Sequence, residues 1–96
     1  MIDVKQAVAK AFEFVGTLYE GEGFQVPQLE EVELSPDDSK WLITVSFLRP
    51  KFLGGVAKQV RDAGLMPPQY EREYKLITLS ADDGTVQSMK IRQLAF

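Results

Sequence analysis

The chain has 96 residues, 45% of them hydrophobic, which predicts one folded domain over residues 1–96 and excludes a disordered chain. A net charge of −3 argues against nonspecific nucleic-acid binding, so no nucleic-acid partner is expected. The absence of cysteine excludes support by disulfides.

The first predicted element is an amphipathic helix over residues 4–18. Asp3 is the expected N-cap, and Gln6, three residues later, is its capping-box partner. Gly21 and Gly23 are expected to end any continuation of the helix. The apolar stripe expected to pack on a sheet consists of Val4, Val8, Ala11, Phe12, Val15 and Leu18.

Two strands are predicted next, over residues 28–35 and 40–48. In the first, Val32 and Leu34 alternate with glutamates, which is the pattern of a half-buried strand. A proline and two aspartates then favour a tight turn. The second strand is expected to be central, and the face it turns toward the helix carries Trp41, Ile43, Val45 and Phe47.

A long connection is predicted over residues 49–68. Its apolar spacing favours a short helix over residues 56–63, with Gly64 as the residue that ends it. The glycines at positions 54 and 55 weaken helix formation there. We therefore expect a short extra helix or a long loop between the second and third strands.

The last two strands are predicted over residues 70–80 and 85–92, joined by a hairpin turn at Asp83-Gly84. The apolar alternation of the third strand is irregular, so it predicts either a bulge near Leu76 or burial on both faces. In the last strand, Met89 and Ile91 are expected to face the helix.

These elements predict an α+β fold in which the N-terminal helix packs on a four-stranded antiparallel meander. Charge is divided unevenly along the chain. Residues 1–48 hold nine acidic and three basic side chains, whereas residues 49–96 hold five acidic and eight basic ones. The simpler interpretation is that the halves neutralise each other across the sheet, and the other is a polar interaction surface.

The sequence contains no histidine and no cysteine, which excludes the common nucleophile systems and the usual zinc sites. Asp37, Asp38, Asp82 and Asp83 lie where turns favour aspartate, so they are interpreted as turn residues rather than metal ligands. We therefore predict no catalytic residues, no metal and no cofactor, and a protein that is not an enzyme.

The long connection combines basic, apolar and flexible character in an otherwise acidic chain. Its residues are interpreted as a recognition face with apolar anchors inside a basic rim. Alternatively, the apolar ones close one end of the core and the basic ones keep a helix solvated. The predicted partner-binding residues are Arg49, Lys51, Phe52, Leu53, Lys58 and Arg61.

Residues 74–86 run from a tyrosine-led strand through Asp82-Asp83-Gly84 to a strand starting near Val86. This segment resembles the closing hairpin of PepSY-type domains, and the element order resembles the cystatin-like class of folds. Ser80 departs from the aspartate usual in that family, and no strand precedes the helix. The resemblance implies a non-enzymatic module that binds a peptide or masks a protein, and it implies no catalytic residues.

The function predicted from the sequence is a small protein- or peptide-binding or regulatory module. Two alternatives stay open: a small-molecule site on the concave face of the sheet, and a self-associating domain, possible as a homodimer, in which acidic and basic edge strands meet. No signal peptide and no apolar run long enough to span a bilayer are visible, so a cytoplasmic location and no membrane partner are expected.

Overall fold

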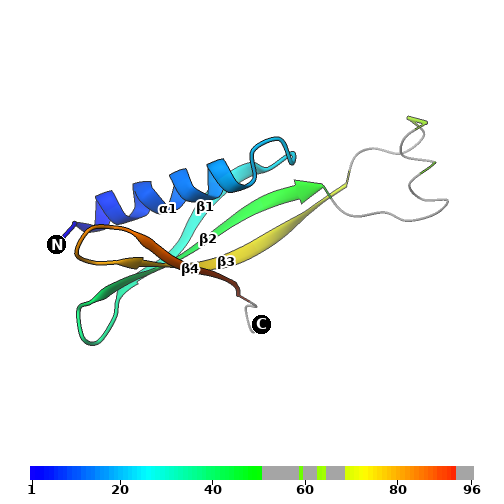
Figure 1. The fold of residues 1–96 in the computed structure, drawn as a ribbon. Coiled ribbons are helices and arrows are strands. Elements are labelled where there is room, and N and C mark those ends of the chain that lie inside the picture. The colour runs from blue at the N-terminus through cyan, green and yellow to red at the C-terminus, as the bar shows by residue number, and fades with distance from the viewer. Residues whose placement is uncertain (51–58, 60–62, 65–68, 93–96) are drawn as a thin grey trace.

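The computed structural model describes residues 1–50, 59, 63–64 and 69–92. Four neighbouring strands form one antiparallel sheet in the order β1-β2-β3-β4, and helix α1 lies across one face of it (Figure 1). This confirms the predicted α+β fold. The short helix predicted over residues 56–63 falls largely outside the described residues. The elements are α1 (Val4–Leu18), β1 (Gln25–Leu34), β2 (Lys40–Pro50), β3 (Tyr70–Ser80) and β4 (Val86–Ile91).

Helix α1 begins and ends at the residues that its sequence predicts. The Asp3 carboxylate accepts a hydrogen bond from the Gln6 backbone N–H at 2.8 Å, and the Gln6 side chain accepts one from the Asp3 N–H at 2.9 Å. The capping box is therefore confirmed. After Leu18, Gly21 adopts a positive φ that lets the chain turn toward β1. No helix among the described residues is long and apolar enough to cross a bilayer.

The helix face that meets the sheet is narrower and more alanine-rich than the predicted stripe. Ala7, Ala11 and Val15 are fully buried, whereas Val4 is 41% and Leu18 is 49% exposed. The assignment of Val4 and Leu18 to the sheet-facing stripe was therefore wrong. Alanines at the centre of the contact let the helix backbone approach the sheet closely, so the bulkier side chains take the margins.

The core between helix and sheet is built on β2 and β3. Ile43, Val45 and Phe47 of β2 are fully buried, as predicted, together with Ile77 and Leu79 of β3. Below the end of α1, the rings of Tyr19 and Phe24 pack on Phe47, with centroids 4.9 and 5.0 Å from it. At the opposite end, Trp41 is half-buried and its indole N–H donates to the carbonyl of Ile2.

The register and burial of the strands decide two predictions. Strands β2 and β3 pair without interruption, so no bulge lies near Leu76, and the alternative, burial on both faces, fits better because no residue from 72 to 80 is exposed. The irregularity lies between β3 and β4, where β4 carries Gln87 as an extra residue. Met89 packs against the core, as predicted, whereas Ile91, which the register places on the same face of the sheet, is 75% exposed. Ile91 ends an edge strand, and α1 packs mainly on the other three strands.

Candidate functional site

The predicted partner face is only partly described. Lys51, Phe52, Leu53, Lys58 and Arg61 lie outside the described residues, so the structure places none of them. Arg49, near the end of β2, is described and is about one third exposed.

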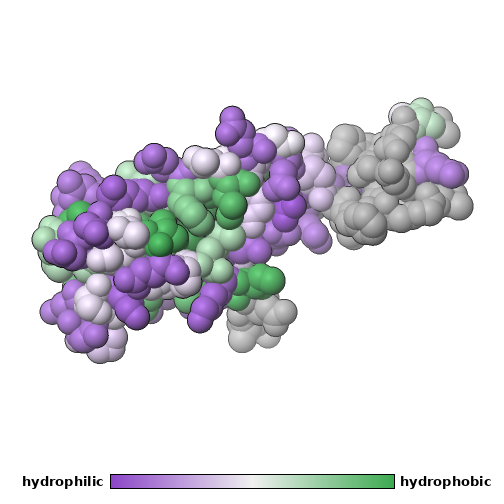
Figure 2. All heavy atoms as spheres, in the orientation of Figure 1, coloured by the Kyte–Doolittle hydropathy of each residue, from purple (hydrophilic) through white to green (hydrophobic). Residues whose placement is uncertain are grey.

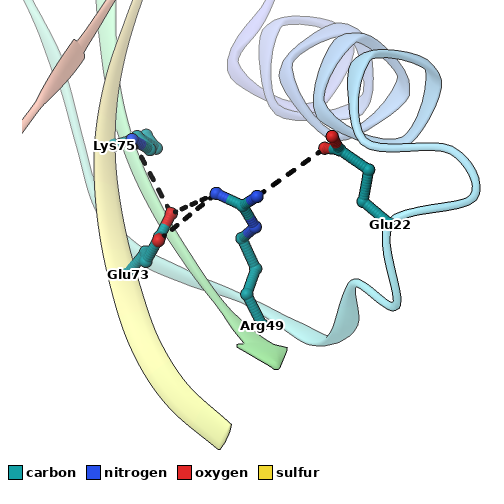
Figure 3. A network of polar contacts seen from close by, with 4 residues as sticks. All are labelled: Glu22, Arg49, Glu73 and Lys75. Atoms are coloured by element: carbon teal, nitrogen blue, oxygen red, sulfur yellow. Dashed lines mark hydrogen bonds and ion pairs between the residues drawn. The ribbon is translucent and has the colours of Figure 1, made fainter. Parts of the chain in front are cut away.

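Arg49 takes part in a network that joins three segments of the chain (Figure 3). Its guanidinium lies 3.3 Å from Glu73 on β3 and 3.8 Å from Glu22 in the loop after α1, and it stacks over the Tyr19 ring at 4.9 Å. Lys75 adds a second cation 3.7 Å from Glu73. The hydrogen-bonding groups of Arg49 are therefore directed toward its own chain, around the buried aromatic residues.

Among the described residues no helix covers the sheet face opposite α1, called here the far face, and polar side chains lie over it. Arg92 follows β4 and donates to Thr44 of β2 at 2.6 Å and to both carboxylate oxygens of Glu31 on β1 at 3.3 Å. Thr44 is only 1% exposed. Arg92 thus connects the two edges of the sheet across its middle.

A second arginine repeats this arrangement further along the sheet. Arg72 of β3 donates to the hydroxyl of Ser46 at 2.8 Å and to the carbonyl of Val26 at 3.4 Å. The Ser46 hydroxyl in turn donates to Glu30 at 2.6 Å. Arginines from the second half of the chain therefore satisfy acceptors from the first half, which supports the interpretation that the two halves neutralise each other across the sheet.

The carboxylates of β1 gather on the far face because the strand is bulged. Leu29 pairs with Val45 and Glu31 pairs with Thr44, so Glu30 is an extra residue between them. Hydrogen bonds to Ser46 and Arg92 place both Glu30 and Glu31 on the far face. Glu33, two residues on, is exposed and forms no ion pair or hydrogen bond with any described residue. The edge strand thus presents an acidic row on one side.

Asp37 and Asp83 stabilise the turns in which they lie, as predicted. Asp37 accepts hydrogen bonds from the hydroxyls of Ser35 and Ser39 at 2.7 and 2.6 Å, and Asp83 accepts one from the Thr85 backbone N–H at 2.9 Å. The Thr85 N–H lowers the pKa of Asp83 below its ordinary value. Within the described ranges, no three acidic side chains are grouped so that they could hold a metal ion.

Asp37 gives a pH-dependent prediction. The Ser39 hydroxyl, followed by the Ser35 hydroxyl and the Ser39 N–H, lowers the pKa of Asp37 from 3.8 to about 2. Because the folded pKa lies below the unfolded one, this contribution to stability is complete above about pH 4 and is lost as the pH falls through 2. An NMR titration of the carboxyl carbon should give a midpoint near 2, and Ser35→Ala/Ser39→Ala should raise it. A native midpoint near 3.8 would contradict the hydrogen-bonded turn.

Along the described part of the chain, four hollows lie at the margins of the sheet, and one of them, about 410 Å³ between the turns near Ser39 and Ala81, has mixed polar and apolar walls. The other three differ in chemistry. The first, about 630 Å³ beside β3 and the end of β4, is lined by five charged residues as well as Tyr74 and Ile91. The second, about 300 Å³, lies between α1 and Val86 of β4, where Figure 2 shows apolar side chains gathered, but Lys10 and Glu13 border it. Charged side chains therefore make up most of the lining of the first hollow, and the lining of the second hollow is partly apolar and partly charged.

The third hollow, between α1 and the edge strand β1, is almost wholly apolar. It measures about 400 Å³ and is called here the α1–β1 groove. Val4 and Leu29 remain 41% and 43% exposed there, while Val8 and Val32 pack against the core behind them. Lys5 is the one charged residue among those lining the groove, which are Val4, Lys5, Val8, Ala9, Leu29 and Val32.

Comparison with protein-family models, with curated proteins and with solved structures finds no match to this chain. The resemblance of residues 74–86 to PepSY-type domains and that of the element order to cystatin-like folds therefore stay predictions.

Sequence reasoning missed the groove, although one signal for it was present. Leu29 is out of phase with Val32 and Leu34, because Leu29 and Val32 are three positions apart rather than two or four. In a strand with one buried face, such a break indicates an inserted residue. The bulge at Glu30 restores the phase and keeps Leu29 on the helix side, where it lines the groove.

Proposed function

We propose that this protein is a non-enzymatic module that binds a segment of a protein or peptide in the α1–β1 groove. The observation that carries the proposal is an open groove of about 400 Å³ lined by Val4, Val8, Leu29 and Val32. Single exposed apolar residues are ordinary on a protein surface. Apolar residues from a helix and an edge strand that share one hollow are typical of a recognition site.

The edge position of β1 supports a peptide rather than a compact ligand. Within the described part of the chain, β1 pairs only with β2, and its first seven residues are exposed along the sheet margin. The groove therefore runs beside a strand whose outer backbone groups are available for pairing. An extended segment can use both the groove and the backbone, which is a common mode of peptide recognition.

The concave face of the sheet supports small-molecule binding less well. Helix α1 covers this face, and the side chains of Ala11, Val15, Ile43 and Val45 between them are fully buried. A non-enzymatic role in the cytoplasm remains part of the proposal, and the cysteine-free composition is consistent with that compartment.

A peptide-display selection tests the groove directly. Random ten-residue peptides selected on the native domain should bind Val4→Gln/Leu29→Gln at least tenfold more weakly, because each lost apolar contact is worth about 1 kcal/mol. The matched control Leu18→Gln/Ile91→Gln removes two exposed apolar side chains outside the groove and should bind as the native domain does.

The same selection separates the groove from the basic connection. The variant Lys58→Glu/Arg61→Glu should retain the selected peptides if the groove is the site. Peptides that are lost only from this variant would place the site in residues 49–66 instead. A selection without enrichment over a blank surface, from several independent libraries, would count against the binding function itself.

A further inference from the structure

The two sides of strand β1 present opposite chemistry to anything that pairs with its outer edge. On the helix side, Leu29 and Val32 line the α1–β1 groove. On the far face, the acidic row of Glu30, Glu31 and Glu33 lies along the same strand. A strand added to this edge places successive side chains alternately on these two sides.

From this we infer that the occupant of the groove is an extended segment whose side chains alternate between apolar and basic, added as a strand along β1. The inference rests on the proposed function and names its ligand. The apolar side chains of the segment enter the groove beside Val4 and Val8. The lysines or arginines between them meet the acidic row.

The charge balance of β1 leaves room for basic side chains. Glu31 is ion-paired with Arg92, yet its side chain is still 48% exposed. Glu30 bonds to a serine hydroxyl, and Glu33 has no ionic partner among the described residues. Arg72 bonds to the same serine hydroxyl, so three carboxylates lie close to two arginines, and the edge keeps a net negative charge that attracts cations on an added strand.

The acidic row also argues against a second copy of the chain as the occupant. If β1 paired antiparallel with β1 of another molecule about Val32, Glu31 of one copy would lie opposite Glu33 of the other. Like charges directly opposite one another destabilise a strand pair. The bulge at Glu30 further disfavours regular pairing along a long edge. Strand β1 therefore disfavours pairing with β1 of a second copy and with acidic segments, and it favours pairing with basic segments.

Three fluorescein-labelled peptides test the chemistry and the spacing. The first alternates lysine and valine over nine residues, the second has the same composition in two blocks, and the third alternates glutamate and valine. Fluorescence anisotropy at low salt should show the alternating lysine peptide binding at least tenfold more tightly than the block peptide, and no binding of the glutamate peptide. Amide NMR signals of residues 29–34 and 4–9 should shift with the first peptide.

A pair of charge-reversal variants locates the acidic contribution. Glu33→Lys should weaken the alternating lysine peptide about fivefold to tenfold, because an exposed attraction becomes a repulsion. Glu13→Lys makes the same charge change on the opposite margin of α1 and should leave the affinity unchanged. Circular dichroism would confirm that both variants fold.

The outcomes distinguish this inference from the proposed function. Equal binding of the alternating and block peptides, or equal effects of the two variants, would overturn the alternating strand. Groove-dependent peptides from the display selection would then still support the function. The inference is also overturned if the lysine peptide does not bind and the selected peptides lack alternating basic residues. If no peptide binds in a groove-dependent way, both the inference and the proposed function are overturned.

Discussion

Replacing Phe47 with alanine is expected to lower the free energy of unfolding by about 3–5 kcal/mol, which is the range for truncating a buried aromatic residue. Phe47 is fully buried and is the largest such side chain in the core. It also contacts the rings of Tyr19 and Phe24, which hold the end of α1 and the start of β1. One truncation therefore loosens three elements.

Urea unfolding followed by circular dichroism measures this effect. A domain of this size has a total stability of about 5–10 kcal/mol, so Phe47→Ala should remove at least about a third of it and lower the urea concentration at the unfolding midpoint in proportion. Phe47→Leu keeps most of the volume and should lose less than half as much. Leu18→Ala, at a site 49% exposed, should change stability by less than about 0.5 kcal/mol. A loss below 1 kcal/mol for Phe47→Ala would show that the aromatic cluster is not the core.

The fold was predictable where the sequence pattern has a strong period. In β2, apolar residues at every second position predicted the strand, its central place in the sheet and its buried face. The strand order confirms the central place, and the full burial of Ile43, Val45 and Phe47 confirms the face. The capping box at Asp3 fixed the start of α1 through contacts only three residues apart. Local hydrogen bonds and a strict alternation depend little on the rest of the chain.

Predictions failed where an apolar residue could serve either the core or its margin. Val4 and Leu18 fit a helical stripe, but Ala7 fits the buried line with Ala11 and Val15 at a spacing of four. Alanine is only weakly hydrophobic, so the larger apolar side chains dominated the pattern. The predicted centre of the buried helix face was therefore rotated around the helix axis away from the line of Ala7, Ala11 and Val15. Ile91 has the correct parity for the core, but its place at the end of an edge strand decides its exposure.

The polar layer of the far face could not be predicted, because it depends on strand register. Arg92 and Glu31 are 61 positions apart, and Arg92 and Thr44 are 48 apart. Only the pairing of four strands brings them together. The difference in charge between the two halves allowed such neutralisation as one of two interpretations, but did not indicate which side chains would meet.

The contact between Arg92 and Thr44 gives the second large expected effect. Arg92→Met should lower the free energy of unfolding by about 1–3 kcal/mol, because it leaves a buried threonine hydroxyl without the guanidinium that bonds to it at 2.6 Å. Thr44→Val should also destabilise the native protein, since it leaves Arg92 with one acceptor fewer. Lys90→Met, an exposed charge removed from β4, should change stability by less than about 0.5 kcal/mol.

The two substitutions together identify the cause. In the Arg92→Met background, Thr44→Val should be neutral or stabilising, because a hydroxyl that has lost its partner is replaced by a methyl group of similar shape. The coupling should persist in 1 M salt, since the hydrogen bond is short and Thr44 is 1% exposed. If the two effects add, or if salt abolishes the loss caused by Arg92→Met, Arg92 acts only through its exposed ion pair with Glu31. In that case the far face is a solvated charge layer rather than a connection between the edges of the sheet.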